Sequence, residues 1–75
     1  MAAKELMQDI LALEEELLAF ERRFGISSEV VYAAYENGEE PENESLVLDF
    51  GEGASVYRTW LERRKIYQQF ERESE

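Results

Sequence analysis

The chain has 75 residues and a net charge of −10, from 18 acidic against 8 basic residues. This length allows one domain with a small core, and so acidic a surface repels nucleic-acid phosphates and anionic membranes. The chain contains no cysteine and no histidine, which excludes disulfides, thiolate metal sites and the commonest general base. No apolar run approaches the roughly 20 residues of a membrane span, and a cysteine-free chain suits the reducing cytoplasm, where we expect it.

The first predicted element is a long helix over residues 2–24, which contain no glycine or proline and many strong helix formers. Gly25 is expected to end it, with Arg22 and Arg23 facing the negative end of the helix dipole. Apolar residues recur at alternating steps of four and three, the spacing of a helix seam: Leu6, Ile10, Leu13, Leu17, Phe20 and Phe24. Three further apolar residues widen the seam, as suits a bundle: Met7, Leu11 and Leu18.

A short connecting helix is predicted over residues 28–37. Ser27 is its expected N-cap, and Ile26 and Val31 have the spacing of a hydrophobic staple across the helix start. Gly38 is expected to stop the helix. Gly25 and this staple together predict how the chain changes direction between the first helix and the short one.

Residues 38–48 are predicted to form an acidic loop, because Pro41 cannot continue a helix and the surrounding carboxylates repel one another. The run from Leu46 to Phe50 has the composition of a short strand. No second strand is available to pair with it, so an extended entry into the last helix is the preferred interpretation.

The last helix is predicted over residues 53–73, with a start weakened by Gly51 and Gly53. Apart from Arg63, its apolar residues repeat the four-and-three spacing: Val56, Trp60, Tyr67 and Phe70. Arg63, Arg64 and Lys65 form a small basic block. We expect this block to pair with acidic residues of the first helix, such as Glu14 or Glu21, since nucleic-acid contact conflicts with the overall charge.

These elements predict an all-α fold of two long antiparallel helices and a short connecting helix. Two amphipathic helices cannot enclose a core alone, so we expect two chains to pair as a homodimeric four-helix bundle. The residues expected in the dimer core come from both long helices: Leu6, Ile10, Leu13, Leu17, Phe20, Phe24, Trp60 and Tyr67.

Few groups in this chain are suited to catalysis. General acid–base chemistry needs a tunable group in a dry pocket, whereas the carboxylates here are expected on solvated helix faces. Di-iron bundles need histidine beside glutamate, and the oxygens of "ENGEEPENE" stand in the wrong order for a calcium loop. We therefore predict no enzyme activity, no cofactor and no metal site, and a carboxylate-based enzyme is the least favoured hypothesis.

Two stretches, "FGISSEVVYAAYENGE" and "LDFGEGASVYRTWLERRK", carry a family resemblance over about two-thirds of the chain. With the acidic loop between them, they resemble small acidic helical proteins of bacteria and archaea. Those proteins are commonly encoded beside a small toxin and are regarded as antitoxin-like components of toxin–antitoxin modules. The resemblance implies a cytoplasmic prokaryotic protein that binds and neutralises a basic partner.

The favoured hypothesis is therefore a non-enzymatic, antitoxin-like module that neutralises a basic protein by covering its surface. The basic partner could be a toxin. It would bind no nucleic acid directly and no membrane, since the chain shows no basic recognition helix. Aromatic anchors and acidic residues of the middle segment are the expected partner-binding residues: Tyr32, Tyr35, Glu39, Glu40, Phe50 and Tyr57. The alternative is a structural homo-oligomer without a dedicated ligand, whose acidity serves solubility alone.

Overall fold

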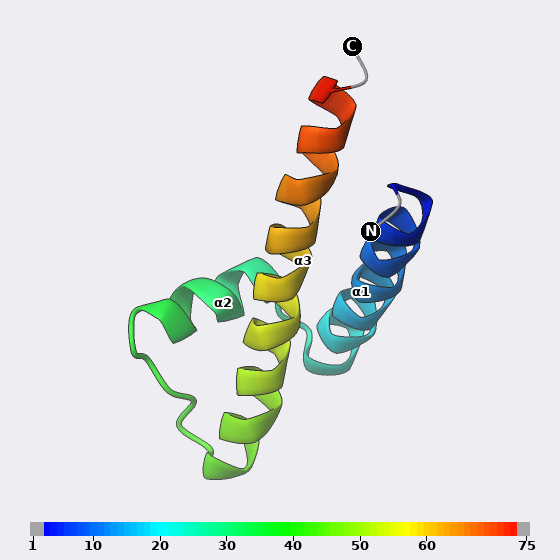
Figure 1. The fold of residues 1–75 in the computed structure, drawn as a ribbon. Helices are drawn as coiled ribbons and strands as arrows, with labels where there is room; N and C mark the ends of the chain where they lie inside the picture. Colours follow the sequence, from blue (N-terminus) through cyan, green and yellow to red (C-terminus); the bar gives the residue numbers. More distant parts are fainter. Residues whose placement is uncertain (1–2, 74–75) are drawn as a thin grey trace.

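Residues 3–73 are described by the computed structural model and fold into helices joined by short loops (Figure 1). The elements in chain order are α1 (Ala3–Phe24), α2 (Ser28–Glu36), the 3-10 turn η1 (Glu44–Leu46) and α3 (Val47–Glu73). The all-α class is thereby confirmed for the described part of the chain. Residue 2, the predicted start of the first helix, lies outside the described residues.

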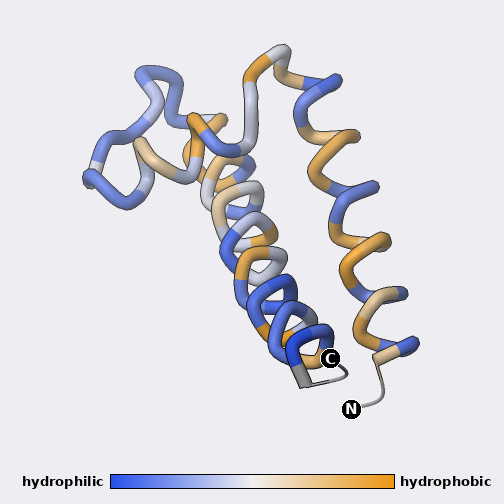
Figure 2. The backbone as a smooth tube through the Cα atoms, turned by 90° about the horizontal axis from the view of Figure 1, so that it is seen from above, coloured by the Kyte–Doolittle hydropathy of each residue, from blue (hydrophilic) through white to orange (hydrophobic). Residues whose placement is uncertain are grey.

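α3 is the central helix of the fold. α1 runs antiparallel along one side of it, and α2 lies against the other side (Figures 1 and 2). The sequence of α3 explains this position, because it carries small and aromatic residues on two faces. Gly53 lies against Phe20 of α1, whereas the Tyr57 ring packs on the Tyr32 ring of α2 with centroids 5.0 Å apart.

Half of the α1 seam is buried within a single chain, and the other half is partly exposed. Leu6 is 0% exposed, and Ile10 and Leu17 are also buried, although all three were expected in a dimer core. The other buried apolar residues are Val31 of α2 and Ala54 of α3. One chain can bury these residues because α1 lies along α3, where Gly53 allows a close approach to Phe20.

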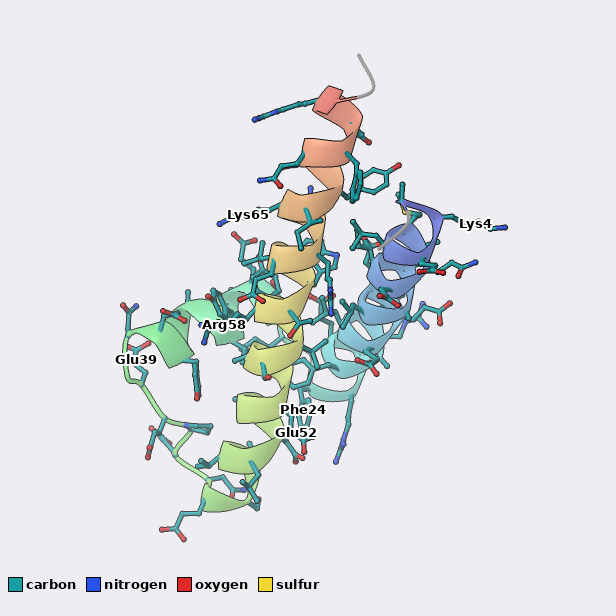
Figure 3. All side chains as sticks on the ribbon, viewed as in Figure 1. Lys4, Phe24, Glu39, Glu52, Arg58 and Lys65 are labelled. Atoms are coloured by element: carbon teal, nitrogen blue, oxygen red, sulfur yellow. The ribbon has the colours of Figure 1, made fainter. Side chains whose placement is uncertain are left out.

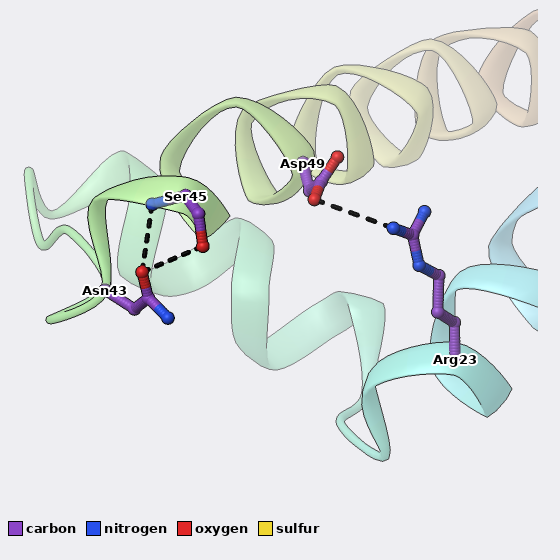
Figure 4. Close-up of polar contacts among 4 residues, drawn as sticks. All are labelled: Arg23, Asn43, Ser45 and Asp49. Atoms are coloured by element: carbon purple, nitrogen blue, oxygen red, sulfur yellow. Dashed lines mark hydrogen bonds and ion pairs between the residues drawn. The ribbon is translucent and has the colours of Figure 1, made fainter.

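Helix α3 begins at Val47, six residues before the predicted start, so the interpretation of 46–50 as extended backbone is wrong. The Asn43 side-chain oxygen accepts hydrogen bonds from the Ser45 N–H (3.0 Å) and hydroxyl (2.8 Å), which initiates η1 and leads into α3 (Figure 4). The acidic loop is correspondingly shorter than residues 38–48. Local capping and the packing of Phe50 outweigh the helix-propensity cost of two glycines, about 1 kcal/mol each.

Three phenylalanines join α1 to the start of α3. The ring centroids of Phe20 and Phe50 lie 5.7 Å apart, and those of Phe24 and Phe50 lie 5.2 Å apart in an edge-to-face arrangement. Gly53 is buried beside this cluster, where a Cβ atom would come within 2.6 Å of Phe20 Cε2. Arg23 and Asp49 add an ion pair of 3.9 Å at the rim (Figure 4), where solvent screening makes it weak.

The turn from α1 to α2 has the predicted glycine but a different cap. Gly25 adopts a φ of 67°, as a helix-ending glycine should. Ser27 occupies the N-cap position without a side-chain capping bond. Instead, the N–H and hydroxyl of Ser28 both donate to Glu21 Oε2 at 2.8 Å, so a carboxylate from α1 caps α2. Both bonds favour the ionised carboxylate and so hold the pKa of Glu21 below its ordinary value. The bond from the Ser28 N–H has the larger effect, and the bond from the Ser28 hydroxyl the smaller.

We predict that Glu21→Gln destabilises the protein by about 1 kcal/mol at neutral pH, since it removes a charged cap. A carboxyl group whose pKa is lower in the folded state stabilises fully above its unfolded pKa, and that stabilisation is lost as the pH falls through the folded pKa. Urea unfolding at a series of pH values should therefore show the two proteins converging below about pH 4.5. Ser27→Ala is the matched control and should cost little; an equal loss there would contradict the capping role of Glu21.

Candidate protein-binding surface

An open apolar groove of about 540 Å³ lies between α2 and the first turns of α3. Val31 forms part of its buried floor, and Phe50 and Gly51 of α3 line the opposite side. Val30 and Tyr35 line the α2 side while remaining 55% and 58% exposed. An accessible groove with large apolar side chains at its edges is typical of a site that binds another protein.

The loop after α2 gives this groove an acidic edge. Glu39 and Glu40 are its only charged lining residues. Both are exposed, and neither makes an ion pair or side-chain hydrogen bond to another residue in the range 3–73. Their negative charge is therefore available to a partner.

Basic residues are absent from the sequence around the groove. The chain has no lysine or arginine between Arg23 and Arg58, an interval that contains all of α2, the loop and the start of α3. Figure 3 shows Lys4 and Lys65 toward the end of the molecule where the termini lie, away from Glu39. The charged groups on the groove lining are thus acidic, while Arg23 and Arg58, which flank this interval, pair with Asp49 and Glu62.

The structure divides the expected partner-binding residues into two groups. Tyr35, Glu39, Glu40 and Phe50 all line the groove. Tyr32 and Tyr57 lie outside it, where they pack α2 onto α3. Because spacing along one chain does not show which face of α3 meets which helix, the sequence grouped residues that the fold separates.

Tyr32 and Tyr57 belong to a row of rings that continues to Trp60. The centroids of Tyr57 and Trp60 are 5.3 Å apart, and the Arg64 guanidinium carbon lies 4.6 Å from the Trp60 centroid. The pKa of Tyr32 is raised above its ordinary value, mainly because the phenol is partly buried and to a smaller extent because the Glu36 carboxylate lies nearby. Half-buried rings in mutual contact contribute mainly to packing between α2 and α3.

Within one chain, Arg64 of the basic block contacts an aromatic ring and not the acidic residues of α1. Arg64 lies over the Trp60 ring, an arrangement typical of a cation–π contact. Glu21 binds Ser28, and no ion pair among residues 3–73 joins the block to Glu14 or Glu21. Among residues 3–73, the weak Arg23–Asp49 pair at the rim is therefore the ion pair that joins the two long helices, and the basic block adds none.

Sequence reasoning missed much of the groove lining. The unassigned lining residues carry no polar side chain: Ile26, Val30, Val31, Ala34, Pro41, Val47 and Gly51. Ile26 and Val31 were interpreted as a staple, and Pro41 only as a helix breaker. The sequence did contain one indication of the groove. The apolar residues of the short helix cover more of its circumference than a single contact with one other helix can bury.

A second exposed apolar region lies on α1. Leu11 and Leu18 remain about half exposed, although they extend the seam. The accessible surface of 5782 Å² exceeds by about 1,000 Å² the value expected for a compact monomer of this mass. The radius of gyration, 14.2 Å, likewise exceeds the roughly 11 Å of a compact chain of this length. A single chain thus leaves an area exposed that is comparable to one side of a standard protein interface.

Residues 3–73 carry neither a metal-ligand cluster nor a candidate membrane span. Within that range, no three histidine, cysteine or acidic side chains cluster as a metal site would require, and no helix there is long and apolar enough to cross a bilayer. Comparison with family models, with curated proteins and with solved structures found no match to this chain. The groove, its acidic edge and the exposed apolar surface are the features of residues 3–73 that indicate a function.

Proposed function

We propose that this chain is a non-enzymatic, antitoxin-like binding module that neutralises a basic protein by covering part of its surface. The observation that carries the proposal is the apolar groove edged by Glu39 and Glu40, which are free of internal ion pairs. An apolar contact area supplies affinity, while surrounding charge of one sign selects an oppositely charged partner and speeds its encounter. The proposed setting is the cytoplasm of a prokaryote.

The proposal is tested by expression and binding together. A small basic protein encoded next to this chain should arrest growth when produced alone, and growth should recover when this chain is produced with it. The two purified proteins should form a complex that dissociates at high salt. A neighbouring protein that is harmless, or that does not bind, would contradict the proposal.

Charge on the loop should control the rate of association. We predict that exchange of four loop glutamates for glutamine slows association with the basic partner about tenfold at low salt and flattens its salt dependence. The four residues are Glu39, Glu40, Glu42 and Glu44. Stopped-flow fluorescence at several salt concentrations measures both effects, and unchanged kinetics would show that the loop does not steer the partner.

We also propose that two chains pair as a homodimer, with α1 and α3 of each forming a four-helix bundle. The exposed Leu11 and Leu18 beside the α1 seam favour it, as does the surplus accessible surface. As an alternative function, this pairing alone would make the chain a structural protein without a dedicated ligand. Sedimentation equilibrium at micromolar concentration should give the mass of two chains; the mass of one chain would overturn the pairing.

A further inference from the structure

Building on the proposed function, we infer that the groove binds one amphipathic helix of the partner, with apolar residues on one face and lysine or arginine beside them. The apolar residues would lie between α2 and the start of α3. The basic residues would lie over Glu39 and Glu40. Direct docking of a helix thus replaces general electrostatic covering as the means of recognition.

The backbone of the groove wall favours a helical partner over an extended one. The last carbonyl groups of α2 are already bonded, since Ala34 O accepts from the Glu39 N–H at 2.9 Å and Tyr35 O accepts from the Gly38 N–H at 3.1 Å. Residues within α2 and α3 bond along their own helices. An extended segment would find no strand among residues 3–73 to pair with, whereas a helix satisfies its own backbone.

The shape of the groove favours side chains that enter from the solvent. Its floor at Val31 is buried, but Val30 and Tyr35 on the wall are more than half exposed. A small ligand normally requires a site that surrounds most of its surface. An open trough between two helices instead fits the apolar stripe of a third helix, read at steps of three and four residues.

The charges at the groove determine the partner's polar residues. The only ionisable groups on its lining, besides the Tyr35 hydroxyl, are the carboxylates of Glu39 and Glu40, which lie on one edge. A partner helix with acidic residues there would be repelled, whereas lysine or arginine would be attracted. The occupant is therefore a basic amphipathic helix and not merely an apolar one.

The test uses a labelled synthetic peptide of about 15 residues, with leucines at helical steps of three and four and lysines elsewhere. A second peptide of identical composition has its leucines scattered around the helix. Fluorescence anisotropy with the full chain should show at least about tenfold tighter binding of the first peptide. Equal binding of both peptides, or none, would overturn the inference.

Two variant pairs locate the binding. Val30→Asp, on the groove wall, should weaken binding of the first peptide about tenfold, whereas Leu48→Asp, at a site 81% exposed and outside the groove, should not. Glu39→Gln with Glu40→Gln should weaken it more than Glu42→Gln with Glu44→Gln, which removes equal charge from the end of the loop and the start of η1. Circular dichroism confirms that each variant is folded. Equal effects within either pair would exclude the groove.

The outcomes separate this inference from the proposed function. A toxic basic partner that binds the Val30→Asp and Leu48→Asp proteins equally well would leave neutralisation intact and overturn groove docking. Peptide binding at the groove without any toxic neighbour would leave groove docking intact and overturn neutralisation.

Discussion

Replacement of Gly53 by alanine is expected to destabilise the protein by about 1–2 kcal/mol, whereas the same replacement at Gly51 should stabilise it by about 1 kcal/mol. Both glycines lie in α3, two positions apart, and both should gain helix propensity from alanine. Their surroundings differ, because a Cβ atom at Gly53 would meet Phe20 at 2.6 Å, whereas one at Gly51 meets nothing within 4 Å. Urea unfolding of the two variants measures the difference.

The cost at Gly53 arises because the Phe20 ring has little room to move. Three of its atoms, Cε2, Cζ and Cδ2, would lie within 3.0 Å of the new Cβ. The ring also packs against Phe24, with centroids 4.8 Å apart, and against Phe50. A shift of the ring would therefore disturb the whole phenylalanine cluster.

A double-mutant cycle identifies this contact as the cause. In a Phe20→Leu background, Gly53→Ala should become neutral or stabilising, because the smaller side chain leaves space for the new Cβ. The helix-propensity gain would then remain without the clash. If Gly53→Ala stabilises the wild-type chain as much as Gly51→Ala does, α1 and α3 do not approach closely at this point.

α1 could be predicted from the sequence, since its apolar residues follow one face for its full length and Gly25 ends it. The start of α3 could not. Gly51 and Gly53 lower the local helix propensity. A glycine is needed at position 53 because of the close contact with Phe20, which lies more than thirty residues earlier in the sequence. The local pattern favours an extended entry, but tertiary packing and the Asn43 cap select a helix.

The candidate site could be predicted only in part for a related reason. The sequence marks Glu39 and Glu40 as acidic and Tyr35 as an expected aromatic anchor, and these residues do line the groove. Composition does not distinguish Tyr35 from Tyr32, three residues earlier, which packs on Tyr57. Because a helix turns by about 100° per residue, the two tyrosine rings point in different directions from α2. Which ring packs on α3 and which lines the groove can be decided only once the position of α3 is known.

Replacement of Leu17 by alanine is expected to cost about 2–4 kcal/mol, a large part of the stability of so small a domain. Leu17 is 6% exposed within one chain, whereas its neighbour Leu18 is 46% exposed. Leu18→Ala should therefore cost less than about 1 kcal/mol in a monomer, since leucine and alanine both favour helix. Urea unfolding at a low protein concentration measures both values.

The dependence of Tm on protein concentration separates burial within a chain from burial between chains. If two chains pair through the exposed side of α1, the Tm of the wild-type protein rises with concentration, and Leu18→Ala reduces that rise. Leu17→Ala should instead lower the Tm at every concentration, because its contacts lie within the chain. A concentration-independent wild-type Tm would overturn the pairing and leave the α1 seam as an intrachain core. Losses from Leu17→Ala as small as those from Leu18→Ala would mean that α1 does not pack on α3 of its own chain.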